Sequence, residues 1–157
     1  MKRALCLVAL AACADAREYH QAYCVTVEGG ESARVEAPAR QWNAALGWEA
    51  LHVTSCPPGA SQVLVRLDSA SIDAEALDGY SDWAQDGADA TIDVRAGISV
   101  DHERAVLLHE LGHVLTRSDA HSLDPRSARC ETPGAHITAQ DVDAVRSALF
   151  AEPATTR

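Results

Sequence analysis

Two histidines and a glutamate stand at a spacing that suits metal chemistry. His109 and His113 are four residues apart, so on a helix they share one face and both imidazoles can bind one ion. Glu110 lies beside them but off that face, where its carboxylate can take a proton from metal-bound water and pass it to a leaving amine. Zinc lowers the pKa of such a water and polarises a carbonyl. The sequence therefore predicts Zn²⁺ as cofactor and hydrolysis of peptide bonds with Glu110 as the base.

A helix must present these three side chains. Asp101 is a suitable N-cap, and Glu103 in the first turn complements the helix dipole, which predicts a helix from there to about Leu115. The apolar residues that give this helix a packing surface are Leu107, Leu108, Leu111, Val114 and Leu115.

Other elements are expected on both sides of this helix. Residue types and alternation predict strands at 23–27, 62–67 and 91–95, while the polar segments 69–90 and 116–136 predict loops. Helices are expected at two further places, one over residues 38–46 and one capped by Thr138. Their expected buried residues are Ala39, Trp42, Ala45 and Leu46 in the first, and Val142, Val145, Leu149 and Phe150 in the second.

The order of these elements predicts the fold class. Strand, helix, strands, zinc helix, loop and helix follow one another in a chain of 157 residues, a length typical of one domain. We expect an α/β (α+β) domain with a small mixed sheet, an active-site helix and a C-terminal helix. The net charge of −10 repels phosphate backbones, so we expect no nucleic-acid partner. The expected substrate is a peptide or protein, because the predicted chemistry is the hydrolysis of peptide bonds.

The N-terminus has the pattern of an export signal. A basic pair precedes apolar residues over 4–12, a run too short to cross a bilayer as a helix. The sequence Leu-Ala-Ala-Cys that ends at Cys13 resembles the lipobox of bacterial lipoproteins, whereas the triplet that ends at Ala16 fits ordinary signal peptidase. We favour lipidation of Cys13. We predict a signal peptide within 1–16, with cleavage before Cys13 if that residue is lipidated, and a catalytic domain in 17–157. Both alternatives predict a location in the cell envelope or outside the cell.

Export places the remaining cysteines in an oxidising compartment. Cys24, Cys56 and Cys130 allow one disulfide among three pairs, with one thiol left over. We favour Cys24–Cys56 because both residues lie in or beside strand-like segments. The chain has no CxxC pair, so a cysteine zinc site has no support.

The segment from 106 to 150 resembles the matrixins, a branch of the metzincin zinc peptidases. The resemblance is carried by the zinc helix over 109–115, by His121-Ser122 with Pro125 soon after it, and by residues 137–142 at the start of the last helix. It implies a metalloendopeptidase with His121 as the third zinc ligand. It also implies that an extended substrate pairs along an edge strand, which we expect at 91–95.

The chain departs from the matrixin pattern around the third ligand. Where the family places glycine, three residues beyond the second histidine, this chain has Thr116. Three residues further on, the expected ligand position holds Asp119, and aspartate is a ligand in a minority of metzincins that resemble snapalysin. His121 fits with a two-residue insertion, and we favour it because Ser122 and Pro125 keep register with it. His121 and Asp119 therefore remain alternative third ligands.

A second departure concerns the methionine that supports the zinc site in this family. Met1 is the only methionine, and Arg129 or Cys130 falls at that position, of which Cys130 suits the floor of a zinc site better. An alternative function is therefore a catalytically degenerate envelope protein with a metzincin fold and structural zinc or none. The presence of Glu110 argues against it. A ligand such as Glu131 would instead indicate a zinc peptidase of another clan.

Overall fold

The fold combines one mixed sheet with helices. The computed structural model describes residues 21–70, 72, 78–83, 89–120, 127 and 134–149. Within these residues the elements are, in chain order, β1 (Tyr23–Glu28), α1 (Ala33–Leu46), β2 (Leu51–His52), β3 (Ser61–Ser69), β4 (Gly79–Trp83), β5 (Ala90–Arg95), α2 (Val100–Thr116) and α3 (Ala139–Leu149). The predicted class, a mixed α/β domain with a small sheet, is confirmed.

The sheet is parallel except at one edge. Its strand order is β2-β1-β3-β5-β4, and β4 pairs antiparallel with β5. The expectation that residues 91–95 form the edge strand is wrong, because this strand is β5 and lies between β3 and β4. The edge strand that lies nearest α2 is β4.

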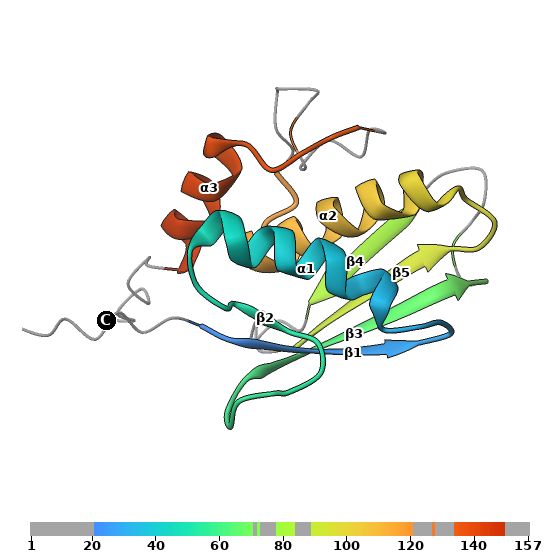
Figure 1. Ribbon diagram of the computed structural model, residues 1–157, viewed down its shortest axis with the longest axis horizontal. Coiled ribbons are helices and arrows are strands. Elements are labelled where there is room, and N and C mark those ends of the chain that lie inside the picture. Colours follow the sequence, from blue (N-terminus) through green and yellow to red (C-terminus); the bar gives the residue numbers. More distant parts are fainter. Residues whose placement is uncertain are drawn as a thin grey trace, which may run out of the picture.

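The core lies between the sheet and the helices. Figure 1 shows α1 and α2 side by side over one face of the sheet, with α3 beside α2. Along β3 and β5 alternate side chains are buried, as the period of two in the sequence predicts. These side chains join the apolar residues of the helices in one cluster, which includes Val63, Val65, Leu67, Ile92, Val94, Leu107 and Leu111.

Helix α1 begins earlier than predicted, so that Pro38 lies inside it. Val35 stands four residues before Ala39 and extends the buried stripe toward the N-terminus. Arg34 in the added first turn is bound to side chains outside the helix. These tertiary contacts outweigh the preference of proline for the first helical turn. Ala45, predicted to be buried, is only partly buried.

Strand β4 lies in a segment that we predicted to be irregular. Its sequence lacks alternating apolar residues, which is the signal on which the prediction depended. The inward positions are Gly79 and Ser81, which are buried although neither is a typical core residue. Small residues fit here because α2 packs closely against this strand. Tyr80 and Asp82 on the opposite face are exposed.

Helix α3 is capped as predicted. The Thr138 hydroxyl accepts a hydrogen bond from the backbone N–H of Asp141, and the Asp141 carboxylate accepts one from the backbone N–H of Thr138. Val145 is buried against the core. The other residues of the predicted face are Val142 and Leu149, which are partly buried, and Phe150, which lies outside the described side chains.

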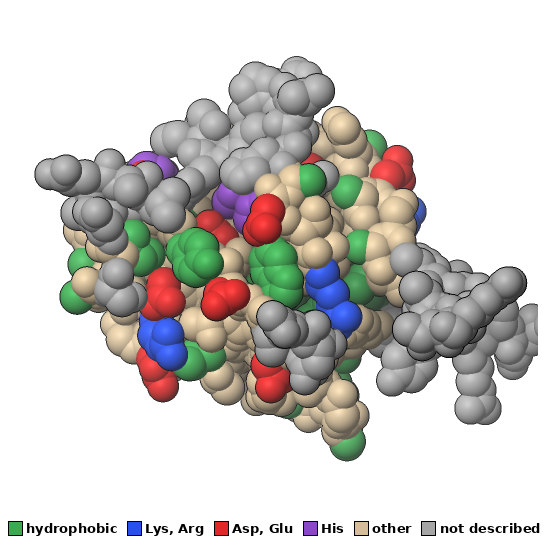
Figure 2. Space-filling model, turned by 180° about the vertical axis from the view of Figure 1, so that it is seen from behind, with side chains coloured by type: hydrophobic (Ala, Val, Ile, Leu, Met, Phe, Trp, Pro, Cys, Tyr) green, Lys and Arg blue, Asp and Glu red, His purple; other side chains and the backbone are tan. Residues whose placement is uncertain are grey.

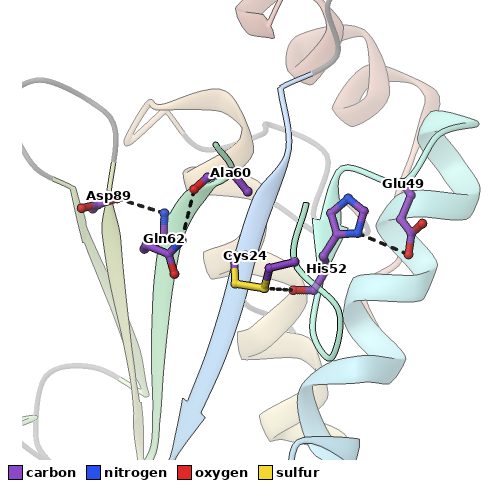
Figure 3. The surroundings of a disulfide bond; sticks show 7 residues. Cys24, Glu49, His52, Ala60, Gln62 and Asp89 are labelled. Carbon is purple, nitrogen blue, oxygen red and sulfur yellow. Dashed lines mark hydrogen bonds and ion pairs between the residues drawn. A yellow bond between two sulfur atoms is a disulfide. The ribbon is translucent and has the colours of Figure 1, made fainter. Parts of the chain in front are cut away.

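The favoured disulfide is confirmed. Cys24 on β1 is bonded to Cys56 in the segment after β2, with their Cα atoms 5.1 Å apart. Figure 3 shows this bond at the end of the sheet that carries β2, where the Cys56 sulfur also approaches the carbonyl of His52. The predicted signal peptide and Cys13 lie outside the described residues, as does Cys130. Among the residues that are described, no helix is long and apolar enough to cross a membrane.

Candidate metal centre

The predicted zinc helix is α2. Its N-cap is Ser99 and not the predicted Asp101, because the Ser99 hydroxyl accepts the hydrogen bond from the backbone N–H of His102. Asp101 and Glu103 lie in the first turn, where their charge complements the helix dipole. The helix contacts α1, α3, β4 and β5, so it is buried on most of its surface. Side chains on α2 are therefore held by neighbours on several sides.

Two contacts from α1 fix the position of α2. Arg34 donates to Glu103 at 2.9 Å and to Asp68 at 3.0 Å, which links α1, α2 and the end of β3. These hydrogen bonds raise the pKa of the Arg34 guanidinium and lower the pKa of the Asp68 carboxyl. Further along, the indole N–H of Trp42 donates to the carbonyl of Leu108 at 2.9 Å, in the turn that carries the histidines.

The two predicted ligand histidines converge. The Nε2 atoms of His109 and His113 are 2.9 Å apart, with ring centroids separated by 4.4 Å and ring planes perpendicular. Both side chains are buried, at 3% and 5% exposure. Zinc takes imidazole nitrogens at about 2.0–2.1 Å, so both Nε2 atoms lie within reach of one ion. The donor set of this pair fits zinc.

A backbone carbonyl orients His113. Its Nδ1 lies 2.6 Å from the carbonyl oxygen of Ser118, an arrangement in which Nδ1–H donates the hydrogen bond. In the neutral ring the lone pair is then on Nε2, the atom that faces His109. Metal-binding histidines commonly use such a hydrogen bond to fix the ring and its tautomer. The carbonyl of Ser118 thus holds the His113 ring in an orientation and tautomer that would suit a metal ligand.

Glu110 lies on a neighbouring face of the helix, toward β4. Its side chain is buried at 4% exposure. Its Oε1 atom lies 3.1 Å from the position that a Cβ atom would occupy on Gly79, so the carboxylate is held close to the backbone of the edge strand. The glutamate is adjacent in sequence to His109 and separate from the ligand row, as the helical spacing predicts.

The chain leaves α2 in a left-handed turn at Arg117. Thr116, where the matrixins have glycine, is the last helical residue, and its hydroxyl donates to the carbonyl of Gly112 at 2.8 Å. Arg117 follows with φ 49° and ψ 44° and ends the helix. The pKa of the nearby Tyr23 phenol is raised because the side chain is buried, and the interaction with Arg117 offsets part of this rise.

The third ligand is not placed by the described residues. Asp119 has an exposed side chain in the loop after α2. In the described ranges, which include Asp119 but not His121, no set of three His, Cys, Asp or Glu side chains is close enough to hold a metal. His121, Arg129 and Cys130 lie outside these ranges, so their predicted positions are untested.

The buried carboxylate of Asp141, in the first turn of α3, binds Ser127 and Thr138, which precede this helix in the sequence. Asp141 is fully buried and accepts hydrogen bonds from the Ser127 hydroxyl at 2.5 Å and from the Thr138 hydroxyl at 2.8 Å. Ser127 also forms an isolated bridge with His136. The sequence predicted the Thr138 cap but not this anchor. The spacing T-x-x-D was the signal that was available.

Three other contributions to the site escaped prediction. Ser118 contributes its backbone carbonyl, a group that every residue has, so the residue type gives no signal of this role. Trp42 was predicted only as a core residue, although a buried indole N–H usually finds a partner. Gly79 falls in the segment predicted to be a loop.

Comparison with known proteins does not identify a family for this chain. No protein-family model matches the chain, and no curated protein sequence matches it. The matrixin resemblance therefore stays a prediction from the motif.

Proposed function

We propose that this chain is an exported zinc-dependent metalloendopeptidase of the matrixin-like metzincin type. The observation that carries the proposal is the buried trio on α2. Two imidazole nitrogens 2.9 Å apart face one point, and a carboxylate follows the first of them in sequence without joining the pair. Two ligands alone would serve a structural metal as well, whereas the adjacent glutamate supplies the base that hydrolysis requires.

Each residue of the trio has a distinct task. His109 and His113 hold the zinc, with His121 favoured as the third ligand and Asp119 as the alternative. Zinc, when bound, lowers the pKa of water and polarises the scissile carbonyl. Glu110 accepts a proton from the attacking water while the new C–O bond forms. It then delivers that proton to the amine as the C–N bond breaks.

The edge strand β4 supports peptide binding beside this trio. Within the described residues β4 has a neighbouring strand on one side only. An extended peptide can pair with the free side of such a strand through backbone hydrogen bonds. Figure 2 shows the face opposite the view of Figure 1, on which acidic and hydrophobic side chains lie close together. The family resemblance led us to expect substrate pairing along β5. Because β4 is the edge strand, we now propose that the substrate pairs along β4.

Export is supported by the Cys24–Cys56 bond, because disulfides persist in oxidising compartments. Lipidation at Cys13 predicts that the wild type sediments with membranes and that Cys13→Ser is soluble outside the cytoplasm. Equal solubility of the two proteins would favour cleavage after Ala16.

The function is tested by zinc content and peptide cleavage of wild type and Glu110→Gln. We expect one zinc per chain in both proteins and a loss of cleavage rate on the order of 10²–10⁴ in the variant. Asp101→Asn, an exposed carboxylate on the same helix, is the matched control and should cleave like wild type. A wild type that binds zinc but cleaves nothing in a broad peptide library would favour the degenerate envelope protein. Equal rates for wild type and Glu110→Gln would show that another residue is the base.

A further inference from the structure

The inward face of β4 meets α2 at Gly79. A Cβ atom added to this residue would overlap Cγ1 of Val106 and would lie 3.1 Å from Oε1 and 3.2 Å from Cγ of Glu110. Both distances are shorter than the 3.4 Å at which ordinary van der Waals contact of a Cβ atom begins. The hydrogen of glycine therefore occupies a space that is bounded by the side chain of the proposed base.

The backbone does not explain why this position is glycine. Positive φ angles occur at Gly29, Gly47, Gly59, Gly97 and Gly134, but not at Gly79. A replacement of glycine by alanine in a conformation that alanine can adopt ordinarily stabilises a protein, because it restricts the unfolded chain. The cost of a side chain at residue 79 thus comes from its contact with α2.

The closest contacts fall on the row of α2 that carries the proposed base. Val106 and Glu110 are four residues apart and form one row on α2, and both are among the atoms nearest to Gly79. His109 and His113 form the next row, and neither is among those nearest atoms. Val106 is β-branched on a helix, so its side chain has little freedom to turn away. A side chain at residue 79 therefore presses on the row that carries Glu110.

We propose that Gly79 is a positioning residue for Glu110, an inference that rests on the proposed peptidase function. The absent side chain leaves the space in which the Glu110 carboxylate lies against the edge strand. A methyl group at this position forces the Glu110 carboxylate to shift by a few tenths of an ångström. A misplacement of about 1 Å in an active site costs on the order of 10²-fold in rate, so this smaller shift costs roughly 2- to 10-fold.

The experiment must separate displacement of Glu110 from the clash with Val106. Val106→Ala removes the atom that would overlap, so Gly79→Ala is made in the Val106→Ala background and compared with that background. We expect kcat to fall by roughly 2- to 10-fold with KM and zinc content unchanged. Ser81→Ala in the same background is the control, because Ser81 is the other buried inward position of β4. An unchanged kcat, or an equal fall in kcat for Ser81→Ala, would overturn the proposal.

A second measurement does not depend on activity. Urea unfolding of the same pair of proteins is repeated with Glu110→Ala added to each, which forms a double-mutant cycle. If Gly79 contacts Glu110, Gly79→Ala lowers the unfolding midpoint more when Glu110 is present than when it is truncated. If the wild type binds zinc and cleaves no peptide, the proposed function fails, and the unfolding cycle alone decides whether Gly79 contacts Glu110. Equal shifts in midpoint with and without the Glu110 side chain would show that Gly79 does not position it.

Discussion

The disulfide offers the sharpest test of how this small domain is stabilised. Cys24 and Cys56 are separated by 32 positions in the sequence, so the bond closes a loop of that size in the unfolded chain. The loss of chain entropy for a loop of this length corresponds to about 4 kcal/mol at 25 °C. Replacement of both residues by alanine should lower the free energy of unfolding by about that amount. Cys24 is buried at 5% exposure, so loss of its sulfur adds a smaller packing cost.

Urea unfolding followed by circular dichroism measures this difference for wild type and Cys24→Ala/Cys56→Ala. Reductant should destabilise the wild type and leave the double variant unchanged, while Cys130→Ala should respond like wild type. Zinc content should not change, because the bond joins β1 to the segment after β2, whereas α2 packs on β4 and β5 at the other side of the sheet. A double variant within about 1 kcal/mol of wild type, or an effect of reductant on both proteins, would refute the entropy argument.

Three further predictions concern the helix ends and the metal. Asp141→Ala should lower the free energy of unfolding by roughly 2–3 kcal/mol, because it removes a buried acceptor of three hydrogen bonds, whereas the exposed Asp143→Ala on the same helix should have little effect. Asp68 has a lowered pKa in the folded protein, so its ion pair stabilises the fold above the ordinary aspartate pKa and loses this effect as the pH falls through the lowered value. Wild type and Asp68→Asn should therefore differ at pH 7, by under about 1 kcal/mol for so exposed a pair, and converge in acid. In metal analysis, His121→Ala should lose zinc and Asp119→Ala should retain it, and the reverse result would assign the ligand to Asp119.

Most of the fold could be predicted because its elements are locally encoded. The alternation in β3 and β5 and the spacing of Trp42 and Leu46 on α1 report directly which side is buried. The first turn of α1 was missed because Arg34 and Val35 are held by partners far away in sequence. Strand β4 was not predicted for a related reason. Helix α2 lies so close that the inward positions of this strand hold small residues, whereas alternation of large apolar residues is the usual sequence signal of a strand.

The candidate site likewise has one part that follows from the local sequence and one part that does not. The relation of His109, Glu110 and His113 follows from helix geometry alone, and the structure places the two imidazoles as that geometry requires. Beyond the helix, the path of the chain depends on the turn at Arg117, whose position could not be predicted from the sequence. Arg117, a residue with no particular preference for the left-handed conformation, makes that turn. The choice between His121 and Asp119 as third ligand therefore stays a prediction.

The burial of α2 bears on why its polar residues are there at all. A helix that is covered on most sides by a sheet and two other helices is expected to be apolar all round. His109, Glu110 and His113 are nevertheless all buried at 5% exposure or less, in a helix that otherwise supplies leucines to the core. Burial of groups that can carry charge costs free energy relative to apolar residues of similar size. Ionisable groups gathered in one buried place are a common feature of functional sites. The same helix thus supplies leucines to the core and carries the proposed zinc-binding residues, and the two inward positions of the edge strand beside it, Gly79 and Ser81, are small.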